Sequence, residues 1–355
     1  MRHDHPNYVR ELDGIRGIAI LLVLWSHLPR EPLGQLLTVC SFAVQPGYLG
    51  VDLFFVLSGF LITRLLLSGR GQKGSLVRFL IRRSLRIFPI YYLTLLVIFA
   101  VEPGRYLAWC AIYASNFAFA FDLTANPMRH SWSLCVEEHF YLFWPFFVAV
   151  ISPERLRLAC LWLMGSAVAL ATVAVVFVDI PTSSGDLIYR GTCFRMLSLV
   201  AGALLAVEEK CIVAGAARWR ARIMWLILGA VFLVGGFRFL PVAQTIGYDF
   251  LPVVKLVGFS MLSTAIILWC IIGQNSHSMF GRCLRGRALG QVGRVSYGLY
   301  LYHFPVFYFF GFRDFDAAAP SLVEVSAALA VTVLITVVSY LLVEAPILKL
   351  KDSFK

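Results

Sequence analysis

The chain has 355 residues, of which 59% are hydrophobic and 14% charged, with a mean hydropathy of +0.79 and a formal net charge of +11. A soluble domain is about 45–50% apolar and about 25% charged. The composition therefore excludes a soluble globular enzyme, a disordered chain and a disulfide-rich secreted domain, and it predicts an all-α, polytopic integral membrane protein. Basic cytoplasmic loops explain the positive charge of such a protein, so the charge does not indicate a nucleic-acid partner.

Eleven apolar segments are candidate membrane spans. In chain order they are Ile15–Leu28, Tyr48–Leu67, Ile87–Val101, Tyr106–Phe121, His139–Ile151, Leu156–Val178, Phe194–Val207, Ile223–Phe239, Val253–Gly273, Val295–Phe312 and Leu322–Val343. Several are shorter than the roughly 20 residues that a perpendicular helix needs, so we expect their helices to extend into flanking motifs. No internal repeat or low-complexity linker separates them. We therefore expect one membrane domain over residues 1–355, with no appended soluble domain.

The distribution of basic residues reduces this set to ten spans. The loop from Arg64 to Arg86 carries seven Lys or Arg residues. The positive-inside rule places this loop, and with it the N-terminus, in the cytoplasm. Four later basic regions fall on the same side only if Tyr106–Phe121 does not span. We therefore predict ten spans with both termini cytoplasmic, and a Tyr106–Phe121 segment that is re-entrant or lies at the outer surface.

Two ionisable residues share one face of the first apolar helix. Arg16 lies at its cytoplasmic start and His27 follows eleven residues later, which is close to three turns of about 3.6 residues. Imidazole is the usual general base near neutral pH, so His27 is a candidate base. The alternative is a structural hydrogen bond between helices, the commoner role of a lone intramembrane histidine.

An arginine cluster lies at the cytoplasmic start of the third segment. Arg82, Arg83 and Arg86 fall within one or two helical turns. Guanidinium groups bind phosphate oxygens in a bidentate manner, which suits a nucleotide-like anionic ligand. Ordinary positive-inside anchoring is the alternative, and on charge alone it is the stronger one.

Adjacent carboxylates, Glu137 and Glu138, occur in the stretch His130–Tyr141 that leads into another apolar segment. Neighbouring helical positions point about 100° apart, so the two carboxylates have different roles and one faces the protein interior. A buried carboxylate can accept or relay a proton, whereas an interfacial pair would only anchor the helix. Under the ten-span topology this motif enters from the outer side and the arginine cluster from the inner side.

Three weaker candidates remain. Asp52 lies near the outer end of the second segment, where it could orient His27 because the two helices are consecutive. Ser58 beside Gly59 indicates a close helix contact rather than a nucleophile. His303 is either structural or lines a substrate path. The eight cysteines show no metal-ligand spacing, so we expect reduced thiols and no metal site.

Taken together, these motifs make the chain resemble the acyltransferase 3 family of integral membrane acyltransferases. The resemblance covers nearly the whole chain, and the order of the motifs makes it specific. The motifs are Glu11–Gly17, Ser58–Leu61, Arg82–Pro89, Trp132–Glu138, Ser296–Pro305 and Glu344–Pro346.

The resemblance implies transfer of an acyl group, usually acetyl from acetyl-coenzyme A, to a hydroxyl of a carbohydrate or lipid-linked glycan. It also implies a bacterial inner membrane. Departures from the family pattern are Cys135 and His139, where Ser and Gln are more common; they put in doubt any role for the neighbours of Glu137. The residues with implied roles are Arg16, His27, Arg83, Arg86 and Glu137.

A mechanism can be formulated on this basis. The Arg-x-x-Arg pair binds the coenzyme A phosphates at the cytoplasmic face, and Arg16 binds pantetheine or phosphate or sets the local field. His27, oriented by Asp52, deprotonates the acceptor hydroxyl. Glu137 is its partner carboxylate, or is itself the base if His27 binds the thioester end. Donor and acceptor would then meet from opposite faces of the membrane.

Two other classes of function remain open. A proton-coupled transporter or flippase of a glycan or small organic acid would use the intramembrane His, Asp and Glu residues as a proton relay. Such a protein is expected to have inverted repeats or broken helices in matching halves, and the sequence shows neither. A membrane sensor without chemistry does not explain the arginine cluster together with a buried histidine.

Overall fold

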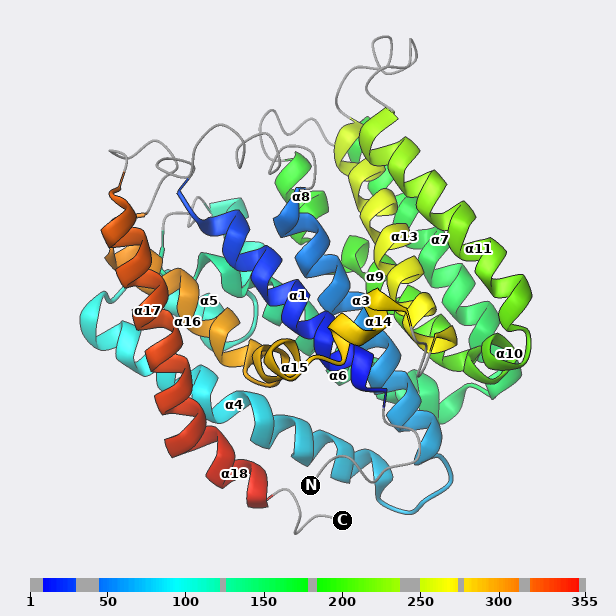
Figure 1. Ribbon diagram of the computed structural model, residues 1–355, viewed down its shortest axis with the longest axis horizontal. Coiled ribbons are helices and arrows are strands. Elements are labelled where there is room, and N and C mark those ends of the chain that lie inside the picture. Colours follow the sequence, from blue (N-terminus) through cyan, green and yellow to red (C-terminus); the bar gives the residue numbers. More distant parts are fainter. Residues whose placement is uncertain are drawn as a thin grey trace. The chain divides into compact units, whose positions relative to one another are not determined.

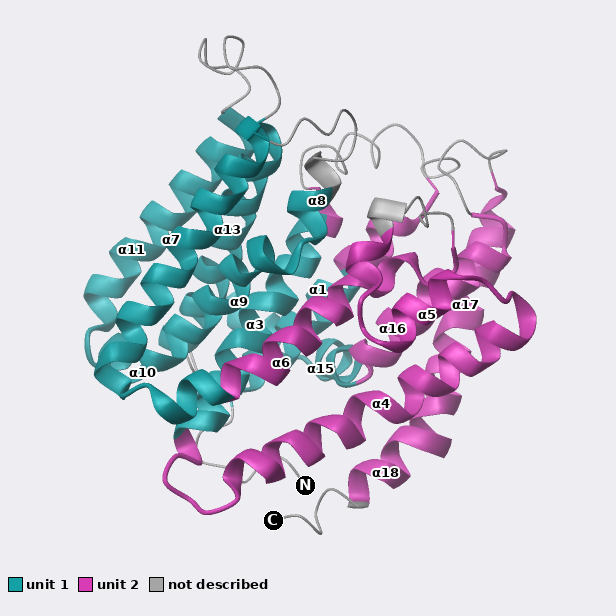
Figure 2. Cartoon of the chain, turned by 180° about the vertical axis from the view of Figure 1, so that it is seen from behind, with its two compact units in different colours: residues 1–21, 48–67, 146–294 teal, residues 22–47, 68–145, 295–355 magenta. Residues whose placement is uncertain are grey.

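The computed structural model of the chain describes residues 9–29, 45–121, 126–177, 184–236, 250–273, 278–312 and 320–350 (Figure 1). Within these ranges every regular element is helical, which confirms the all-α prediction. The chain divides into two compact units (Figure 2). Unit 1 comprises residues 1–21, 48–67 and 146–294, and unit 2 comprises residues 22–47, 68–145 and 295–355.

The regular elements are mainly α-helices, with short 3-10 and π-helical pieces. The α-helices are α1 Arg10–His27, α3 Pro46–Ser68, α4 Ser75–Val101, α5 Tyr106–Ala111, α6 Trp132–Val150, α7 Pro153–Phe177, α8 Ser184–Arg190, α9 Thr192–Val207, α10 Glu209–Ala214, α11 Ala216–Val231, α13 Leu251–Ile272, α14 Met279–Leu284, α15 Arg287–Arg294, α16 Ser296–Phe309, α17 Leu322–Ser339 and α18 Ala345–Leu350. The 3-10 helices are η1 Ser115–Phe121 and η2 Arg129–Ser131, and the π-helices are η3 Phe232–Gly236 and η6 Tyr340–Glu344.

Six helical segments in the described part of the chain are long and apolar enough to cross a membrane. They are Pro46–Ser68, Ser75–Val101, Pro153–Phe177, Ala216–Gly236, Leu251–Ile272 and Leu322–Lys349. In four of them a third or less of the most apolar stretch is buried, as on Leu322–Lys349 with 28%, whereas 67% is buried on Pro46–Ser68 and 50% on Leu251–Ile272. A lipid-facing surface explains this exposure. The finer expectation of ten spans stays a prediction.

The segment Tyr106–Phe121 is broken into two short helices. Helix α5 has six residues and η1 has seven, with Tyr113 between them in a left-handed conformation (φ 53°). A six-residue α-helix is about 9 Å long at about 1.5 Å per residue. Neither piece is long enough to cross a bilayer of about 30 Å.

Unit 1 contains helices α7, α9, α11 and α13, with α7 beside α9, α9 beside α13 and α13 beside α11 (Figure 1). Helix α9 also crosses α3 at a reciprocal glycine contact. A Cβ atom added to Gly59 would overlap the carbonyl group of Leu199, and one added to Gly202 would overlap that of Val56. This finding confirms the predicted close contact at Ser58–Gly59, because only glycine lets two backbones approach so closely.

In unit 2, α16 packs against α17, α4 and η2. Helix α17 begins with a capping box in which Ser321 and Glu324 each accept a hydrogen bond from the other's backbone. It continues through the π-helix η6 into α18, and both η6 and α18 pack against α4. The last residue of η6 is Glu344, which is buried. Single π-helical turns occur frequently at functional sites, which makes this carboxylate a candidate functional group.

Candidate functional site

Three imidazole rings come together in unit 2. They belong to His27 at the end of α1, His130 on η2 and His303 on α16. The ring of His303 lies 5.1 Å from that of His27 and 5.1 Å from that of His130, measured between centroids. His130 and His303 are buried, with 3% and 0% of their surface exposed, and His27 is partly buried. The sequence singled out His27, whereas the meeting of three histidines comes from the fold.

The backbone of α1 determines which nitrogen of the neutral His27 ring carries the proton. Its Nδ1 lies 2.9 Å from the carbonyl oxygen of Val23, one turn earlier. A carbonyl only accepts hydrogen bonds, so Nδ1 carries the proton and Nε2 carries the lone pair of the neutral ring. Nε2 is therefore the basic nitrogen, and the ring is oriented by its own helix.

Aromatic side chains surround the imidazole cluster. Phe304 stacks on His130 at 5.3 Å and meets His27 edge-on at the same distance. The Tyr300 hydroxyl donates to the carbonyl of His130 at 3.0 Å and pairs with Ser133 on α6. These contacts join η2, α6 and α16 around the cluster and hold its rings in place.

Pro305 shapes the same region from within α16. A proline has no N–H, so the carbonyl four residues earlier, that of Leu301, has no helical partner. That carbonyl lies beside the His130 ring. Both ring nitrogens of His130 are buried without a hydrogen bond of normal geometry. His130 lies on η2, outside the candidate spans. Burial lowers the pKa of its imidazole to about 3, and the nearby charge of His27 contributes to the same effect.

A second polar cluster of unit 2 joins α4 to α6. Nη2 of Arg83 lies 3.9 Å from Oε2 of Glu137, and the guanidinium carbon lies 3.7 Å from the centre of the Tyr141 ring. The Tyr141 hydroxyl donates to the same carboxylate oxygen at 2.7 Å. Arg83 and Glu137 are thus in contact, whereas the charge pattern placed them at opposite entrances to the membrane. The physical reason is that helix boundaries differ from the apolar boundaries: α4 begins at Ser75, well before Arg83.

Two further carboxylates face the arginine pair. Arg83 acts electrostatically on Glu138, and Arg86 acts on Glu344 of η6. One oxygen of Glu138 and one of Glu344 are buried without a hydrogen-bond partner. The two arginines of the Arg-x-x-Arg motif therefore lie opposite carboxylates from two different elements, α6 and η6.

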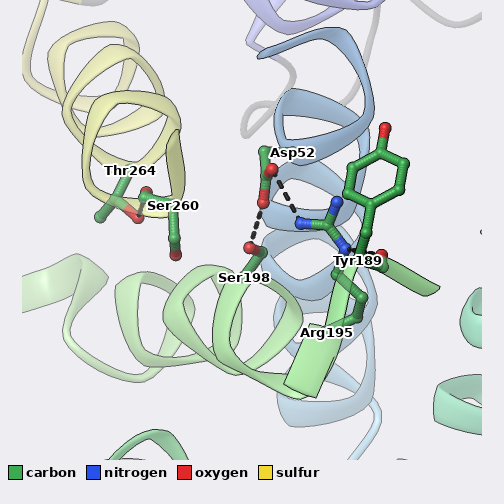
Figure 3. Close-up of polar contacts among 6 residues, drawn as sticks. All are labelled: Asp52, Tyr189, Arg195, Ser198, Ser260 and Thr264. Carbon is green, nitrogen blue, oxygen red and sulfur yellow. Dashed lines mark hydrogen bonds and ion pairs between the residues drawn. The ribbon is translucent and has the colours of Figure 1, made fainter. Parts of the chain in front are cut away.

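Asp52 has its partners within unit 1 (Figure 3). Its Oδ2 lies 2.9 Å from Nη1 of Arg195, its Oδ1 accepts a hydrogen bond from Ser198, and neither Asp52 nor Arg195 is exposed to solvent. Arg195 also donates through Nε to the carbonyl of Tyr189 at 2.6 Å and lies 4.5 Å from the centre of that ring. These contacts give Asp52 a structural role. The expectation that it orients His27 stays a prediction.

Arg16 pairs locally in unit 1. Its Nη1 lies 3.0 Å from Oδ1 of Asp13, three residues earlier on α1. Arg195 is absent from the predicted site residues, although an arginine inside the apolar stretch Thr192–Val207 is as unusual as His27 in the first helix. His130, two residues before the Trp132–Glu138 motif, likewise had no predicted role. No group of His, Cys, Asp or Glu side chains suited to a metal ion occurs among the described residues.

The model of the protein family described as "Acyltransferase domain" matches residues 9–344. The chain belongs to the acyltransferase 3 family. This result confirms the resemblance drawn from the motifs. The matched range includes both polar clusters of unit 2 and the Asp52–Arg195 pair of unit 1.

Several relatives of this acyltransferase 3 chain are named O-acetyltransferases, and some of these names specify peptidoglycan. It is 30% identical to the putative peptidoglycan O-acetyltransferase YrhL of Bacillus subtilis strain 168 over 85% of this chain and 49% of the relative. It is 29% identical to the O-acetyltransferase OatA of Staphylococcus aureus strain NCTC 8325 over 97% of this chain and 58% of the relative. It is 28% identical to the peptidoglycan O-acetyltransferase OatA of Listeria monocytogenes serovar 1/2a over 96% of this chain and 56% of the relative. The chain thus spans about half the length of the curated relatives it matches. No solved structure matches it.

Proposed function

We propose that this chain is a membrane-bound acyltransferase that moves an acyl group, in the first place acetyl, from acyl-coenzyme A to a hydroxyl of a glycan, glycolipid or related acceptor. The observation that carries the proposal is the His27 ring, whose Nδ1 is anchored to the Val23 carbonyl so that Nε2 is the base. Family membership and the names of the relatives support O-acetyl transfer to a glycan. Acyl-coenzyme A is proposed as the donor because the Arg83 and Arg86 guanidinium groups are suited to binding its phosphates.

In the proposed reaction, Nε2 of His27 takes the proton of the acceptor hydroxyl while the hydroxyl oxygen forms a bond to the acyl carbon. The carbon–sulfur bond of the thioester breaks, and the imidazolium returns the proton to the sulfur. Atoms and charge balance and no atom changes its oxidation state, so the step needs no redox partner. Glu137 is the alternative base, although its contacts are with Arg83 and Tyr141.

Arg83 and Arg86 are the proposed phosphate-binding residues of the donor site. Each already faces a carboxylate, which keeps its guanidinium group oriented before an anion arrives. The 3.9 Å contact between Arg83 and Glu137 is longer than an optimal ion pair of about 2.7–2.9 Å. A phosphate group can therefore compete for Arg83 or share it. For Arg16 we propose binding of pantetheine or phosphate, as the resemblance implies.

The position in the membrane is also part of the proposal. The six candidate spans and the family support an integral membrane protein. We propose ten spans in the bacterial inner membrane with both termini cytoplasmic. Basic residues at the start of α4 would then face the cytoplasmic donor, and a glycan acceptor would be reached from the other side.

Purified protein in proteoliposomes, supplied with labelled acetyl-coenzyme A and a glycan acceptor, tests the proposal. Wild-type protein is expected to form acylated acceptor and His27→Ala to form none. His139→Gln is the matched control, because this histidine lies on α6 with its ring 6.2 Å from that of Phe117 and is not one of the three rings of the cluster. Activity of the His27→Ala variant equal to wild type would contradict the assignment of the base.

A transporter or flippase is the second candidate function. The buried carboxylate oxygens of Glu138 and Glu344 that lack hydrogen bonds favour it, because such groups can relay protons. Counterflow of a labelled glycan or organic acid into protein-containing vesicles, with no acylated product, would support transport and reject the enzyme.

A further inference from the structure

His303 occupies a place in unit 2 that the proposed reaction does not yet use. Its ring is fully buried and lies 5.1 Å from the ring of His27. The ring of His130 lies at the same centroid distance, and Phe307 meets the His303 ring edge-on at 5.9 Å. His303 is thus enclosed by aromatic rings from α1, η2 and its own helix.

The backbone of α16 fixes which nitrogen of His303 carries its proton. Nδ1 lies 2.7 Å from the carbonyl oxygen of Tyr300 and 3.1 Å from that of Leu299. Both carbonyls are acceptors, so Nδ1 is the donor and the neutral ring has its lone pair on Nε2. Nε2 lies across the ring from these contacts and is turned away from the α16 backbone. It is buried without a hydrogen-bond partner.

An unsatisfied buried acceptor requires an explanation, because it costs about 1–3 kcal/mol of stability. Anchoring of α16 uses Nδ1 alone, so the Nε2 lone pair has no part in holding the helix. The lone pair of Nε2 is the negative end of the imidazole dipole. It is fully buried, and away from bulk water the interaction of a dipole with a nearby charge is strong.

We propose that His303 is a positioning residue of the acyl transfer that acts through His27: its Nε2 lone pair stabilises the imidazolium that His27 becomes when it takes the hydroxyl proton. This inference rests on the proposed function, in which His27 is the base. The fixed tautomer matters because a ring protonated at Nε2 would present a positive dipole end to the same charge. His303 therefore lowers the energy of the transition state, in which His27 is charged, and leaves the binding of the reactants to the enzyme with neutral His27 unchanged.

Two substitutions separate this role from a structural one. His303→Asn keeps a donor close to the Nδ1 position, so it preserves the bonds to Tyr300 and Leu299 and removes the Nε2 lone pair. His303→Gln places an amide near the Nε2 position and gives up the anchor. Both variants are compared with wild type, with His27→Ala and with the control His139→Asn in the proteoliposome assay. The readouts are kcat, KM for acetyl-coenzyme A and for the acceptor, and thermal unfolding in detergent.

The expected results cross over between the two variants. His303→Asn should unfold like wild type but lose about 10- to 100-fold in kcat, which equals about 1.4–2.7 kcal/mol, with both KM values within about twofold of wild type. His303→Gln should be less stable, yet should recover most of kcat per folded molecule.

Three results would overturn the inference. The first is a His303→Asn variant with wild-type kcat. The second is a His303→Asn variant in which only KM changes. The third is a His303→Asn variant that does not fold, because Nε2 would then serve the structure. Failure of the proposed function looks different, because His27→Ala would then be active or wild type would form no acylated product. An inactive His27→Ala with a fully active His303→Asn would reject the present inference alone.

Discussion

Replacement of Asp52 by asparagine removes the negative charge from a fully buried ion pair. Asp52 lies on α3 and Arg195 on α9, with their charged atoms 2.9 Å apart and both side chains 0% exposed (Figure 3). After Asp52→Asn, the Arg195 guanidinium would retain the Tyr189 carbonyl and two aromatic faces, those of Tyr189 at 4.5 Å and Phe55 at 5.6 Å. These groups do not neutralise its charge.

The expected loss in the free energy of unfolding is about 3–5 kcal/mol, the range for a buried pair that loses one partner. Arg195→Met should cost a similar amount, because it leaves the Asp52 carboxylate buried with Ser198 as its hydrogen-bond donor. The double variant carries no buried charge at this place and should lose much less than the sum of the two. The coupling between the two sites should therefore be large, as it is for directly bonded charges.

The assay is a double-mutant cycle of unfolding in mixed micelles, combined with acyl transfer by the same four proteins. If Asp52 stabilises the contact of α3 and α9, the double variant regains stability and activity together. A double variant as stable as wild type but without activity would show that Asp52 acts in the reaction, as the sequence analysis expected. Additive effects of the two single substitutions would refute the reasoning from the ion pair.

Three further predictions concern other contacts. Gly202→Val should lower the free energy of unfolding by about 1–3 kcal/mol, because its side chain would collide with the backbone of α3. Gly165→Ala is the control in the same unfolding assay. Its Cβ atom would meet no atom within 4 Å, so this substitution should be neutral or slightly stabilising. Arg83→Ala should raise and Glu137→Gln should lower the KM for acetyl-coenzyme A, each by about three- to tenfold, because the carboxylate competes with phosphate for the guanidinium; equal shifts in the same direction would contradict this competition. The pKa of His130 is about 3 in the folded state and about 6.5 in the unfolded state, so between these pH values only the unfolded state binds the proton. The free energy of unfolding should therefore fall by about 2 kcal/mol from pH 7 to pH 5. This contribution should vanish in His130→Gln. An unchanged acid slope in that variant would show that other groups control it.

The amino-acid sequence was sufficient for the fold class, the family and the residues that do not belong in an apolar environment. Composition alone predicts a helical membrane protein, and the order of the motifs identifies the family that matches residues 9–344. Arg83 and Glu137 are visible as clustered charges at the starts of apolar segments. The anomaly at His27 is visible because placing a polar group among apolar residues is energetically expensive. The same argument applies to Arg195, which could have been found in this way.

The tertiary structure alone decided which of these groups meet. Asp52 pairs with Arg195, 143 residues away, and Ser133 pairs with Tyr300, 167 residues away. Arg83 contacts Glu137 although the loop charges assign them to different sides of the membrane. Helical periodicity fixes which residues of one helix share a face, but the partner of that face depends on how helices from distant parts of the chain pack. The energetic cost of burying a polar residue therefore makes that residue recognisable in the sequence. The packing of the helices decides which group compensates this cost.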